Sequence, residues 1–548
     1  MTDLTGLGRL APAVQLELDR MTRERWAERL WASDGTLWST DPEVAAETTR
    51  WTGWLNVADV VRADLPRLQQ LASDVIEAGF THLVVAGMGG SSLCPDVLRE
   101  TFPGHGSYPE LHVLDSTDPA TIARVQSAID LRHTLFIISS KSGGTLETLS
   151  HYRYFRAQVE AVVDTDVGSH FIAITDDGSG LHKLATEGGF REVFLNPATI
   201  GGRYSALSYF GMVPAALAGV DVEGLLWSAH DMAGQCRRGE AGENPGLILG
   251  ALLGAGAAAG RDKVSLVCDE PIATFGTWLE QLLAESTGKH GKGVVPVEGE
   301  PPGSVEDYGP DRVFVHLRVA RAPGPASILA GSLVAAGHPV LTIDVPDTLR
   351  LGAEFLRWEV ATAAAGALIG INPFDQPNVQ ESKDNTAAVL KRFLETGDFG
   401  TAGGGDIEAA RGLLDSIRDG DYFAVLAYTE AGDEVEERLA ELRIAVRSRF
   451  KVATTRGYGP RYLHSTGQLH KGGPNSGVYL ILSDRREDDI RVPGEKYGFR
   501  TLITAQWVGD LKSLRDHDRR VAHVTLGEDR LASLDALVQL AGTAAYGG

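Results

Sequence analysis

Over most of the chain, short apolar runs alternate with segments of helical periodicity. From about Thr81 these runs are THLVVAG, ELHVLDS, TLFIISS, HFIAIT and EVFLN, and polar or helical stretches separate them. Apolar runs of this length between helices are typical of strands buried in a parallel sheet. The pattern therefore predicts a doubly wound α/β domain over 76–230.

The same alternation starts again near Lys263. KVSLVCD, RVFVHLRV and PVLTID predict strands, and the small-residue segment GLILGALLGAGAAAG before them predicts a helix. We expect a second parallel-sheet domain of the same class over 235–400.

The last part of the chain predicts a smaller α/β unit over 405–548. The glycine-rich stretch 400–405 predicts a linker to it. DYFAVLAYT, GVYLILSD and AHVTL predict strands, and a charged helix is expected around 434–449.

The first 75 residues show helical periodicity and predict a helical N-terminal segment. This segment carries five tryptophans, which we expect in the core: Trp26, Trp31, Trp38, Trp51 and Trp54.

Composition narrows the class of protein. The 548 residues carry a net charge of −22, which argues against a nucleic-acid or anionic-membrane surface. Cys94, Cys236 and Cys268 form no CxxC pair, so neither a disulfide framework nor a cysteine-rich zinc site is expected. The start of the sequence lacks a signal-peptide profile, and no run of about 18 apolar residues occurs. We expect a cytoplasmic protein.

The clearest chemical signal is SKSGGT at 140–145, between the expected strand TLFIIS and the expected helix LETLSHYRYF. A Ser/Thr/Gly loop that enters a helix N-terminus offers hydroxyls, backbone N–H groups and the positive end of the helix dipole, which suit a phosphate monoester. The alternative is an ordinary capped helix, because Ser and Thr are common N-caps.

A second glycine-rich loop, GMGGSS at 87–92, follows the strand THLVVA and lies at the same edge of the expected sheet. It lacks the third glycine of a GxGxxG dinucleotide fingerprint. GKHGKG at 288–293 resembles a Walker A loop in composition only, which excludes it as a nucleoside triphosphate site.

Five ordered motifs carry a resemblance to a known family: GMGGSS, SKSGGTLET, GGRYSALS at 201–208, QLLAESTGK at 281–289 and NPFDQPNVQESK at 372–383. Over about 80–390 the chain resembles the phosphoglucose isomerases. It is most similar to the divergent members that some bacteria carry fused behind a transaldolase, although this sequence contains no transaldolase segment. The resemblance implies two sugar-isomerase (SIS) domains and reversible conversion of glucose 6-phosphate to fructose 6-phosphate through an enediol, with no cofactor.

The resemblance also assigns the substrate-binding loops. The family holds the substrate phosphate on the SKSGGTLET loop, here with the hydroxyls of Ser140, Ser142, Thr145 and Thr148 and the charge of Lys141. Gly90, Ser91, Glu147 and Gly202 match positions that line the sugar pocket. For Ser91 and Glu147 simple helix capping is the alternative.

An aldose–ketose isomerisation needs one base that moves a proton from C2 to C1. Glu285 matches the catalytic glutamate of the family, with Gln281 one turn earlier as a sugar-contacting amide. A solvated helix face is the alternative for Glu285. Arg203 would stabilise the enediolate, because its guanidinium keeps its charge at any working pH; a structural salt bridge is the alternative.

Opening the sugar ring needs an acid and a base, which in the family are a lysine and a histidine. Lys383 matches the family lysine and Gln376 its glutamine partner. The family places its histidine between the glutamate and the lysine, and here that interval holds only histidines in unlike surroundings: His290, His316 and His338.

We nominate His464, which Gln468 follows in a local pattern similar to the family's histidine segment, with His470 as the fallback. His464 comes after Lys383, which departs from the family order. In the family the neighbouring subunit donates this histidine, which implies that a homodimer is necessary for activity.

Several alternatives stay open. No HExxH or DxDxDG pattern occurs, so no metal is expected, and zinc at His464 and His470 has little support. A dual isomerase that also accepts mannose 6-phosphate would depend on the pocket shape near residues such as Thr287. A non-catalytic sugar-phosphate sensor is the second alternative. A nicotinamide oxidoreductase, the third, is disfavoured by the incomplete glycine fingerprint.

Overall fold

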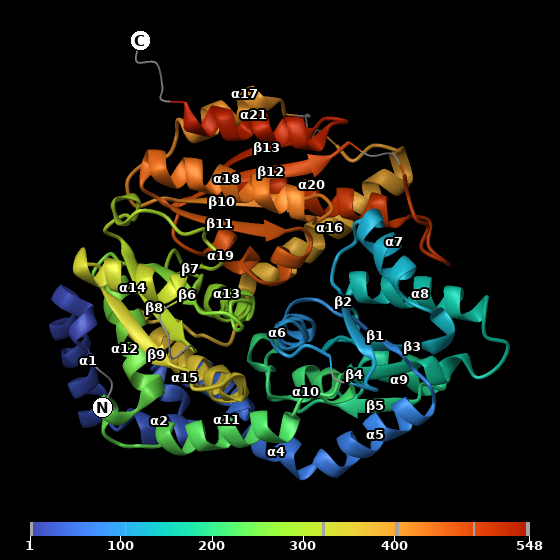
Figure 1. Cartoon of the computed structure of the whole chain (residues 1–548), viewed down its shortest axis with the longest axis horizontal. Coiled ribbons are helices and arrows are strands. Elements are labelled where there is room, and N and C mark those ends of the chain that lie inside the picture. The colour runs from blue at the N-terminus through green and yellow to red at the C-terminus, as the bar shows by residue number, and fades with distance from the viewer. Residues whose placement is uncertain (1–3, 105, 320–323, 401–404, 486–487, 544–548) are drawn as a thin grey trace.

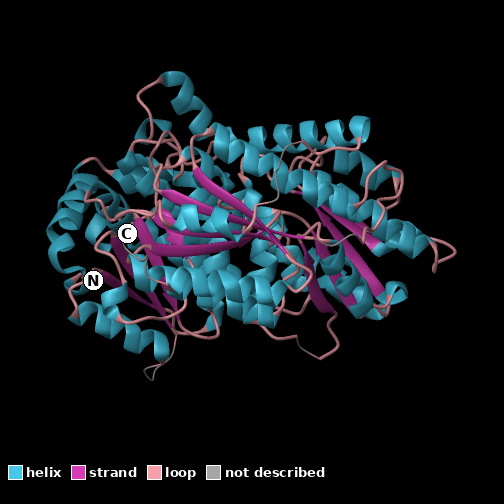
Figure 2. Cartoon of the chain, turned by 90° about the horizontal axis from the view of Figure 1, so that it is seen from above, coloured by secondary structure: helices cyan, strands magenta, loops and turns pink. Residues whose placement is uncertain are grey.

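The computed structural model describes residues 4–104, 106–319, 324–400, 405–485 and 488–543. Within these residues the chain forms three parallel sheets with helices packed around them, which confirms the α/β class (Figure 1). Seen from above, helices lie outside the strands over most of the molecule (Figure 2). No helix in the described ranges is both long enough and apolar enough to cross a membrane.

The N-terminal segment is helical. Its helices are α1 (Ala11–Arg23), α2 (Trp26–Trp31), α3 (Pro42–Thr49), α4 (Val57–Ala63) and α5 (Leu65–Glu77). Trp26, Trp38 and Trp54 are buried, whereas Trp31 and Trp51 pack only partly buried against the same core. The prediction that all five lie in the core is therefore right for three of them.

The first sheet has the strand order β2-β1-β3-β4-β5, and all its pairs are parallel. Its strands are β1 (His82–Ala86), β2 (Glu110–Leu114), β3 (Thr134–Ser139), β4 (Phe171–Thr175) and β5 (Glu192–Leu195). The helices that follow are α6 (Leu93–Thr101), α7 (Pro119–Ala128), α8 (Leu146–Glu160), α9 (Gly180–Glu187), α10 (Tyr209–Leu217), α11 (Val222–Cys236) and α12 (Pro245–Ala258). Every residue of β3 is buried, as expected for a strand covered on both faces.

The second sheet has the order β7-β6-β8-β9 and is also parallel. Its strands are β6 (Lys263–Cys268), β7 (Val295–Val297), β8 (Arg312–Arg318) and β9 (Val340–Asp344). Its helices are α13 (Phe275–Thr287), α14 (Pro325–Ala335), α15 (Leu351–Ile369) and α16 (Pro377–Thr396). The short strand β7 is absent from the sequence prediction, because three residues give too little pattern to detect.

The C-terminal unit, described over 405–485 and 488–543, holds a third parallel sheet in the order β11-β10-β12-β13. Its strands are β10 (Tyr422–Tyr428), β11 (Ala453–Tyr458), β12 (Gly477–Asp484) and β13 (Arg520–Leu526). Its helices are α17 (Ile407–Leu414), α18 (Asp433–Phe450), α19 (Gly467–Gly472), α20 (Phe499–Asp516) and α21 (Arg530–Gly542). Most of the expected linker, 401–404, lies outside the described residues.

The hydrophobic core crosses the expected borders between units. One continuous cluster joins the N-terminal helices to the first and second sheets. Another packs Ala284 of α13 and Val297 of β7 against the third sheet. The division into 1–75, 76–230, 235–400 and 405–548 therefore remains a proposal about chain organisation. Packing couples these parts closely.

Candidate active site

Two loops of the first sheet lie side by side because their strands are neighbours. β1 pairs with β3 in parallel, with Ala86 opposite Ile138, so GMGGSS and SKSGGT leave the sheet at the same edge. The short helical turn η4 (Gly89–Ser91) follows β1, and α8 follows β3. Open α/β sheets bind ligands at this edge.

The SKSGGT loop is built around paired hydroxyls. Ser140 Oγ lies 2.9 Å from Thr145 Oγ1 and accepts a hydrogen bond from the Gly143 N–H at 3.2 Å. Thr145 is the N-cap residue of α8, yet its side chain makes no capping bond to the helix. Ser142 is exposed, whereas Thr148 is fully buried and its hydroxyl has no hydrogen-bond partner among the described residues. The helix start therefore presents hydroxyls that an anion can use.

The Lys141 side chain contacts an acidic and an aromatic residue outside its own loop. Its ammonium group forms an ion pair with Asp176, which follows β4, and lies 5.2 Å from the ring centroid of Trp51. Its charge is thus already partnered in this structure.

Glu285 lies on α13, which follows the first strand of the second sheet. Its Oε1 accepts a hydrogen bond from Arg203 Nη1 at 3.1 Å, and its Oε2 accepts one from Gln281 Nε2 at 2.9 Å. Gln281 and Glu285 meet because residues four apart share a helix face. The side chain of Glu285 is 11% exposed, so the solvated helix face considered from the sequence is excluded.

Arg203 is almost completely buried and fully hydrogen bonded. Besides Glu285, its guanidinium donates to Ser286 Oγ at 2.8 Å and to Gln376 Oε1 at 2.6 Å. It also donates to the main-chain carbonyls of Pro373 and Asp375. The GGRYS, QLLAESTGK and NPFDQP motifs therefore converge on one guanidinium, which places Gln376 beside Arg203.

Aromatic rings pack against the chain segments next to Arg203. Trp54 of the N-terminal helices stacks on Tyr204 with ring centroids 5.1 Å apart, and Tyr204 packs against Phe374 at 5.2 Å. Trp38 meets the edge of Phe374 at 5.2 Å. The buried tryptophans thus hold the chain segments that carry Arg203 and Gln376.

The glycines of GMGGSS allow close approach between elements. Gly89 has a φ of +56°, and a Cβ there would lie 2.8 Å from Gln281 Nε2 and 2.6 Å from the His464 carbonyl oxygen. A Cβ on Gly90 would lie 2.0 Å from the Gly202 carbonyl oxygen. Ser91 is buried at the end of this turn. Only glycine fits at these contacts.

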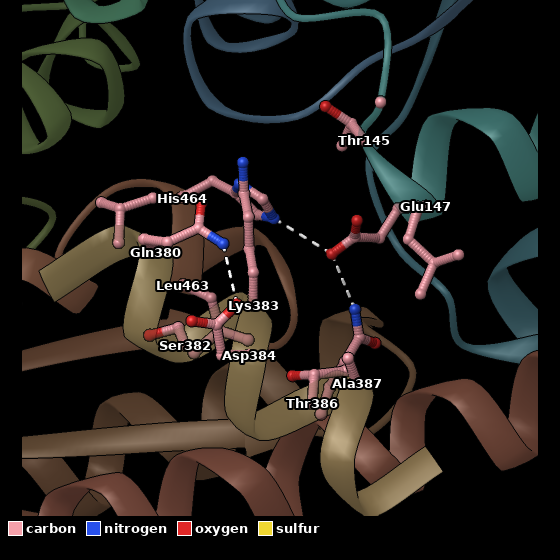
Figure 3. Close-up of a pocket in the computed structure, with 14 residues that line it drawn as sticks. Thr145, Glu147, Gln380, Ser382, Lys383, Asp384, Thr386, Ala387, Leu463 and His464 are labelled. Carbon is pink, nitrogen blue, oxygen red and sulfur yellow. Dashed lines mark hydrogen bonds and ion pairs between the residues drawn. The ribbon is translucent and has the colours of Figure 1, made fainter. Parts of the chain in front are cut away.

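A cavity of about 290 Å³ lies between α8, α16 and the C-terminal unit (Figure 3). Thr145 and Glu147 line it from the first sheet, Lys383 from α16, and His464 from the turn after β11. Lys383 and His464 both line the cavity, and the His464 ring points toward Glu147. The structure thus brings both ring-opening candidates to the helix start that carries the hydroxyls.

Glu147 fixes the orientation of the His464 ring. Glu147 Oε1 lies 3.0 Å from His464 Nε2 and accepts a hydrogen bond from Gln506 Nε2 at 2.7 Å. Burial alone would raise the pKa of Glu147, but the charge and hydrogen bond of His464 lower it to about 2. The carboxylate therefore stays ionised at any working pH.

Residue 464 also connects the cavity to Glu285. Its main-chain carbonyl accepts a hydrogen bond from Gln281 Nε2 at 2.8 Å, while its ring faces Glu147. Gln281 Oε1 is buried without a hydrogen-bond partner among the described residues. A free acceptor lies next to Glu285.

The fallback histidine lies elsewhere. His470 is buried, and its ring packs against Tyr462 and Tyr479. Burial, together with the nearby Lys471, lowers the pKa of His470 well below its usual value. His464 is thus the histidine of this segment that faces the cavity.

Two residues near the site were missed from the sequence. Gln506 on α20 has no motif around it, and only the folded chain brings it to Glu147. Lys289 does stand in QLLAESTGK: its Nζ contacts Asp375 Oδ1 at 2.6 Å and the Asn372 carbonyl at 2.8 Å. Burial and the neighbouring Arg203 lower the pKa of Lys289 to about 8. The motif itself could have suggested this residue.

Within the described ranges, one group of side chains has the spacing of a metal site: His82, Glu110 and His112, whose ligand atoms lie within 4.8 Å of one another. These residues stand at the start of β1 and β2, at the opposite end of the sheet from the two loops. This group is not part of the candidate active site.

Comparison with known proteins identifies the family. The phosphoglucose isomerase family profile matches residues 68–297. The glucose-6-phosphate isomerase of Rubrobacter xylanophilus is 31% identical over 425 residues, which cover 67% of this chain and 94% of that protein. This chain belongs to the phosphoglucose isomerase family. Another member, from Thermosynechococcus vestitus, is 29% identical and covers 70% of this chain and 80% of its own length.

Solved structures show the same fold. A hypothetical protein from Thermus thermophilus matches with a TM-score of 0.59 and 25% identity, over 71% of this chain and all of that one. A glucose-6-phosphate isomerase from Chlamydia trachomatis matches with a TM-score of 0.54 and 21% identity, over 69% of this chain and 86% of that one. The sequence matches above confirm the expected family. The two structural alignments cover similar shares of this chain, 71% and 69%.

Proposed function

We propose that this chain interconverts glucose 6-phosphate and fructose 6-phosphate by proton transfer, with Glu285 as the base. One observation carries the proposal: the Glu285 carboxylate is held between Arg203 and Gln281, at 3.1 and 2.9 Å, and its side chain is 11% exposed. The family relatives are named for this reaction.

The isomerisation follows from these contacts. Glu285 removes the proton from C2 of the open-chain aldose, the electrons of that bond form the C1–C2 double bond, and the carbonyl electrons move to O1 to give the enediolate. The hydroxyl proton of O2 passes to O1, and Glu285 returns its proton to C1, which leaves the ketose carbonyl at C2. Negative charge develops on the substrate oxygens in this step. The positive charge of Arg203, which lies beside the Glu285 carboxylate, would stabilise that developing charge. A fixed cation of this kind is worth about 3 kcal/mol, by analogy with oxyanion donors. Gln281 Oε1 has no partner among the described residues and can accept a substrate hydroxyl.

Ring opening is assigned to Lys383 and His464. One group must remove the proton from the C1 hydroxyl while the other protonates the ring oxygen, and both side chains line the same cavity. Glu147 holds the His464 ring in place for this step. The hydroxyls of the SKSGGT loop, with Thr145 at the cavity wall, would bind the phosphate.

Thr287 does not support the alternative that mannose 6-phosphate is also a substrate. This residue is fully buried, and its hydroxyl donates to the Leu283 carbonyl at 2.7 Å and accepts from the Val294 N–H at 2.9 Å. Its hydrogen bonds thus hold α13 to the segment before β7. Parallel assays with glucose 6-phosphate and mannose 6-phosphate decide the specificity.

The test is a coupled assay with each hexose phosphate on the wild type, Glu285→Gln and Glu280→Gln. General-base catalysis contributes about 10²- to 10⁴-fold, so Glu285→Gln should lower kcat by that factor. Glu280 lies on the same helix but bonds Ser465, and its variant is the matched control. Near-normal turnover by Glu285→Gln would make the base assignment wrong. Tight sugar-phosphate binding by a wild type without turnover would support the sensor instead.

We also propose a cytoplasmic location and a homodimer. The small number of cysteines, three with no CxxC pair, and the net charge of −22 support the first, and the family resemblance supports the second. Light scattering on the purified chain measures the oligomeric state.

A further inference from the structure

Side chains from three separate parts of the chain line the cavity. Thr145 and Glu147 belong to the first sheet and Lys383 to α16, while His464 and Gln506 belong to the C-terminal unit. Glu147 accepts hydrogen bonds from both residues of the C-terminal unit. The C-terminal unit thus lines the cavity and holds Glu147.

The C-terminal unit is tied directly to the helices that carry Glu285 and Lys383. Gln468 Nε2 donates to the Gly288 carbonyl at 2.9 Å, just after the end of α13. The same side chain bonds both the N–H and the side-chain oxygen of Asn378 at 2.8 Å, in the first turn of α16. One amide therefore fixes the relative position of both helices and the His464 segment.

Two arginines hold the unit to both other sheets. Arg461, three residues before His464, pairs with Asp96 at 2.7 Å and Asp115 at 3.2 Å on the first-sheet side. Arg443 is buried and donates to the carbonyls of Glu298 and Gly299, which follow β7. Separating these surfaces would break the ion pairs of Arg461 and leave the buried Arg443 guanidinium without its acceptors, which disfavours movement of the unit as a body.

The chain's own His464 segment already occupies the space that a histidine segment from a second molecule would need. The His464 carbonyl lies so close to Gly89 that even one added methyl group would approach it to 2.6 Å. A histidine segment from a second molecule cannot enter this space while the chain's own segment occupies it.

We propose that the C-terminal unit completes the active site in cis, so that each chain uses its own His464 and is active without a histidine from a second copy. The proposal rests on the isomerase function proposed above. It replaces the neighbouring-subunit supply implied by the family resemblance, and it is compatible with the homodimer proposed above.

Complementation between two inactive chains tests the proposal. Glu285→Gln and His464→Asn chains carry different affinity tags, are expressed together, and are assayed with glucose 6-phosphate. If sites were shared in a two-fold dimer, random pairing would restore about a quarter of the wild-type sites, because the mixed dimer regains one intact site. We expect no activity beyond the sum of the two variants expressed alone.

A dilution series supplies the second readout. The specific activity of the wild type should stay constant across concentrations at which ultracentrifugation finds only the single chain. Activity that disappears with dissociation, or restored activity in the mixture, would overturn the cis proposal while leaving the isomerase function intact. A wild type without isomerase activity would instead overturn the proposed function. Thermal unfolding of both variants checks that they fold.

Discussion

His464 Nε2 and Glu147 Oε1 lie 3.0 Å apart, although 317 positions separate the two residues in the chain. A buried carboxylate beside an imidazole fixes which ring nitrogen carries the proton and where the other nitrogen points. The cavity therefore contains an oriented histidine.

Replacing Glu147 should lower turnover through His464. We expect Glu147→Gln to lower kcat for glucose 6-phosphate by about 10- to 100-fold, because the amide still accepts a hydrogen bond but supplies no charge. Its KM should change little. The low pKa of Glu147, about 2, means that any loss of activity between pH 5 and 7 arises from another group.

Glu160→Gln, at the exposed far end of α8, is the matched control and should behave like the wild type. Equal kcat values for the two variants would show that Glu147 does not orient the histidine.

Binding of the substrate phosphate should depend more on the hydroxyls of the SKSGGT loop than on its lysine. Thr145→Val removes a hydroxyl at the cavity wall, and we expect KM for glucose 6-phosphate to rise about 10-fold, the usual loss for a hydrogen bond to a charged group. Lys141→Met should change KM less, because Lys141 already pairs with Asp176. Initial-rate kinetics measure KM for both variants. A larger rise for Lys141→Met would mean that this ion pair opens when substrate binds.

Gly89 should not tolerate a side chain. Gly89→Ala combines a positive φ with contacts of 2.6 and 2.8 Å, so we expect destabilisation of about 1–3 kcal/mol and a lower kcat. Gly79→Ala is the control, since Gly79 has a φ of +80° with open space around it. That variant should lose about 1 kcal/mol and keep its activity. Equal losses of stability and full activity in both variants would argue against close packing of Gly89.

Glu280 should make stability depend on pH. Burial and the neighbouring Glu298 raise the pKa of Glu280 to about 8, above the value near 4.5 of an exposed glutamate. Between these values the folded chain holds a proton that the unfolded chain has released, so stability falls as pH rises. The slope from this residue is at most about 1.4 kcal/mol per pH unit.

Urea unfolding of the wild type and Glu280→Gln at pH 5.5 and 7.5 measures this effect. The variant should gain stability relative to the wild type as pH increases, because its amide cannot ionise. A constant difference between the two proteins at both pH values would contradict the raised pKa.

The sequence predicts the sheets well because each central strand is a continuous apolar run between turn signals. β3 and β10 are buried at every position, and such runs are read directly from the amino acids. β7, with three residues, and β11, whose ATTRGY is partly polar, gave no such signal. Strand length and burial thus explain both the successes and the omissions.

The site was only partly predictable for a different reason. Arg203, Glu285 and Gln376 stand in motifs, so the residues could be named before their contacts were known. The ion pair of Lys141 with Asp176 and the bond from Gln506 to Glu147 join distant segments, and no local pattern encodes them. Contacts of this kind appear only when the three sheets pack together.

The two roles of residue 464 have a consequence for how this enzyme can change. Its peptide carbonyl joins the helix of the proposed base, while its imidazole serves the neighbouring cavity. The link to the base therefore belongs to the backbone and survives replacement of the ring. Evolution or protein engineering can exchange the chemistry at this position without rebuilding the scaffold.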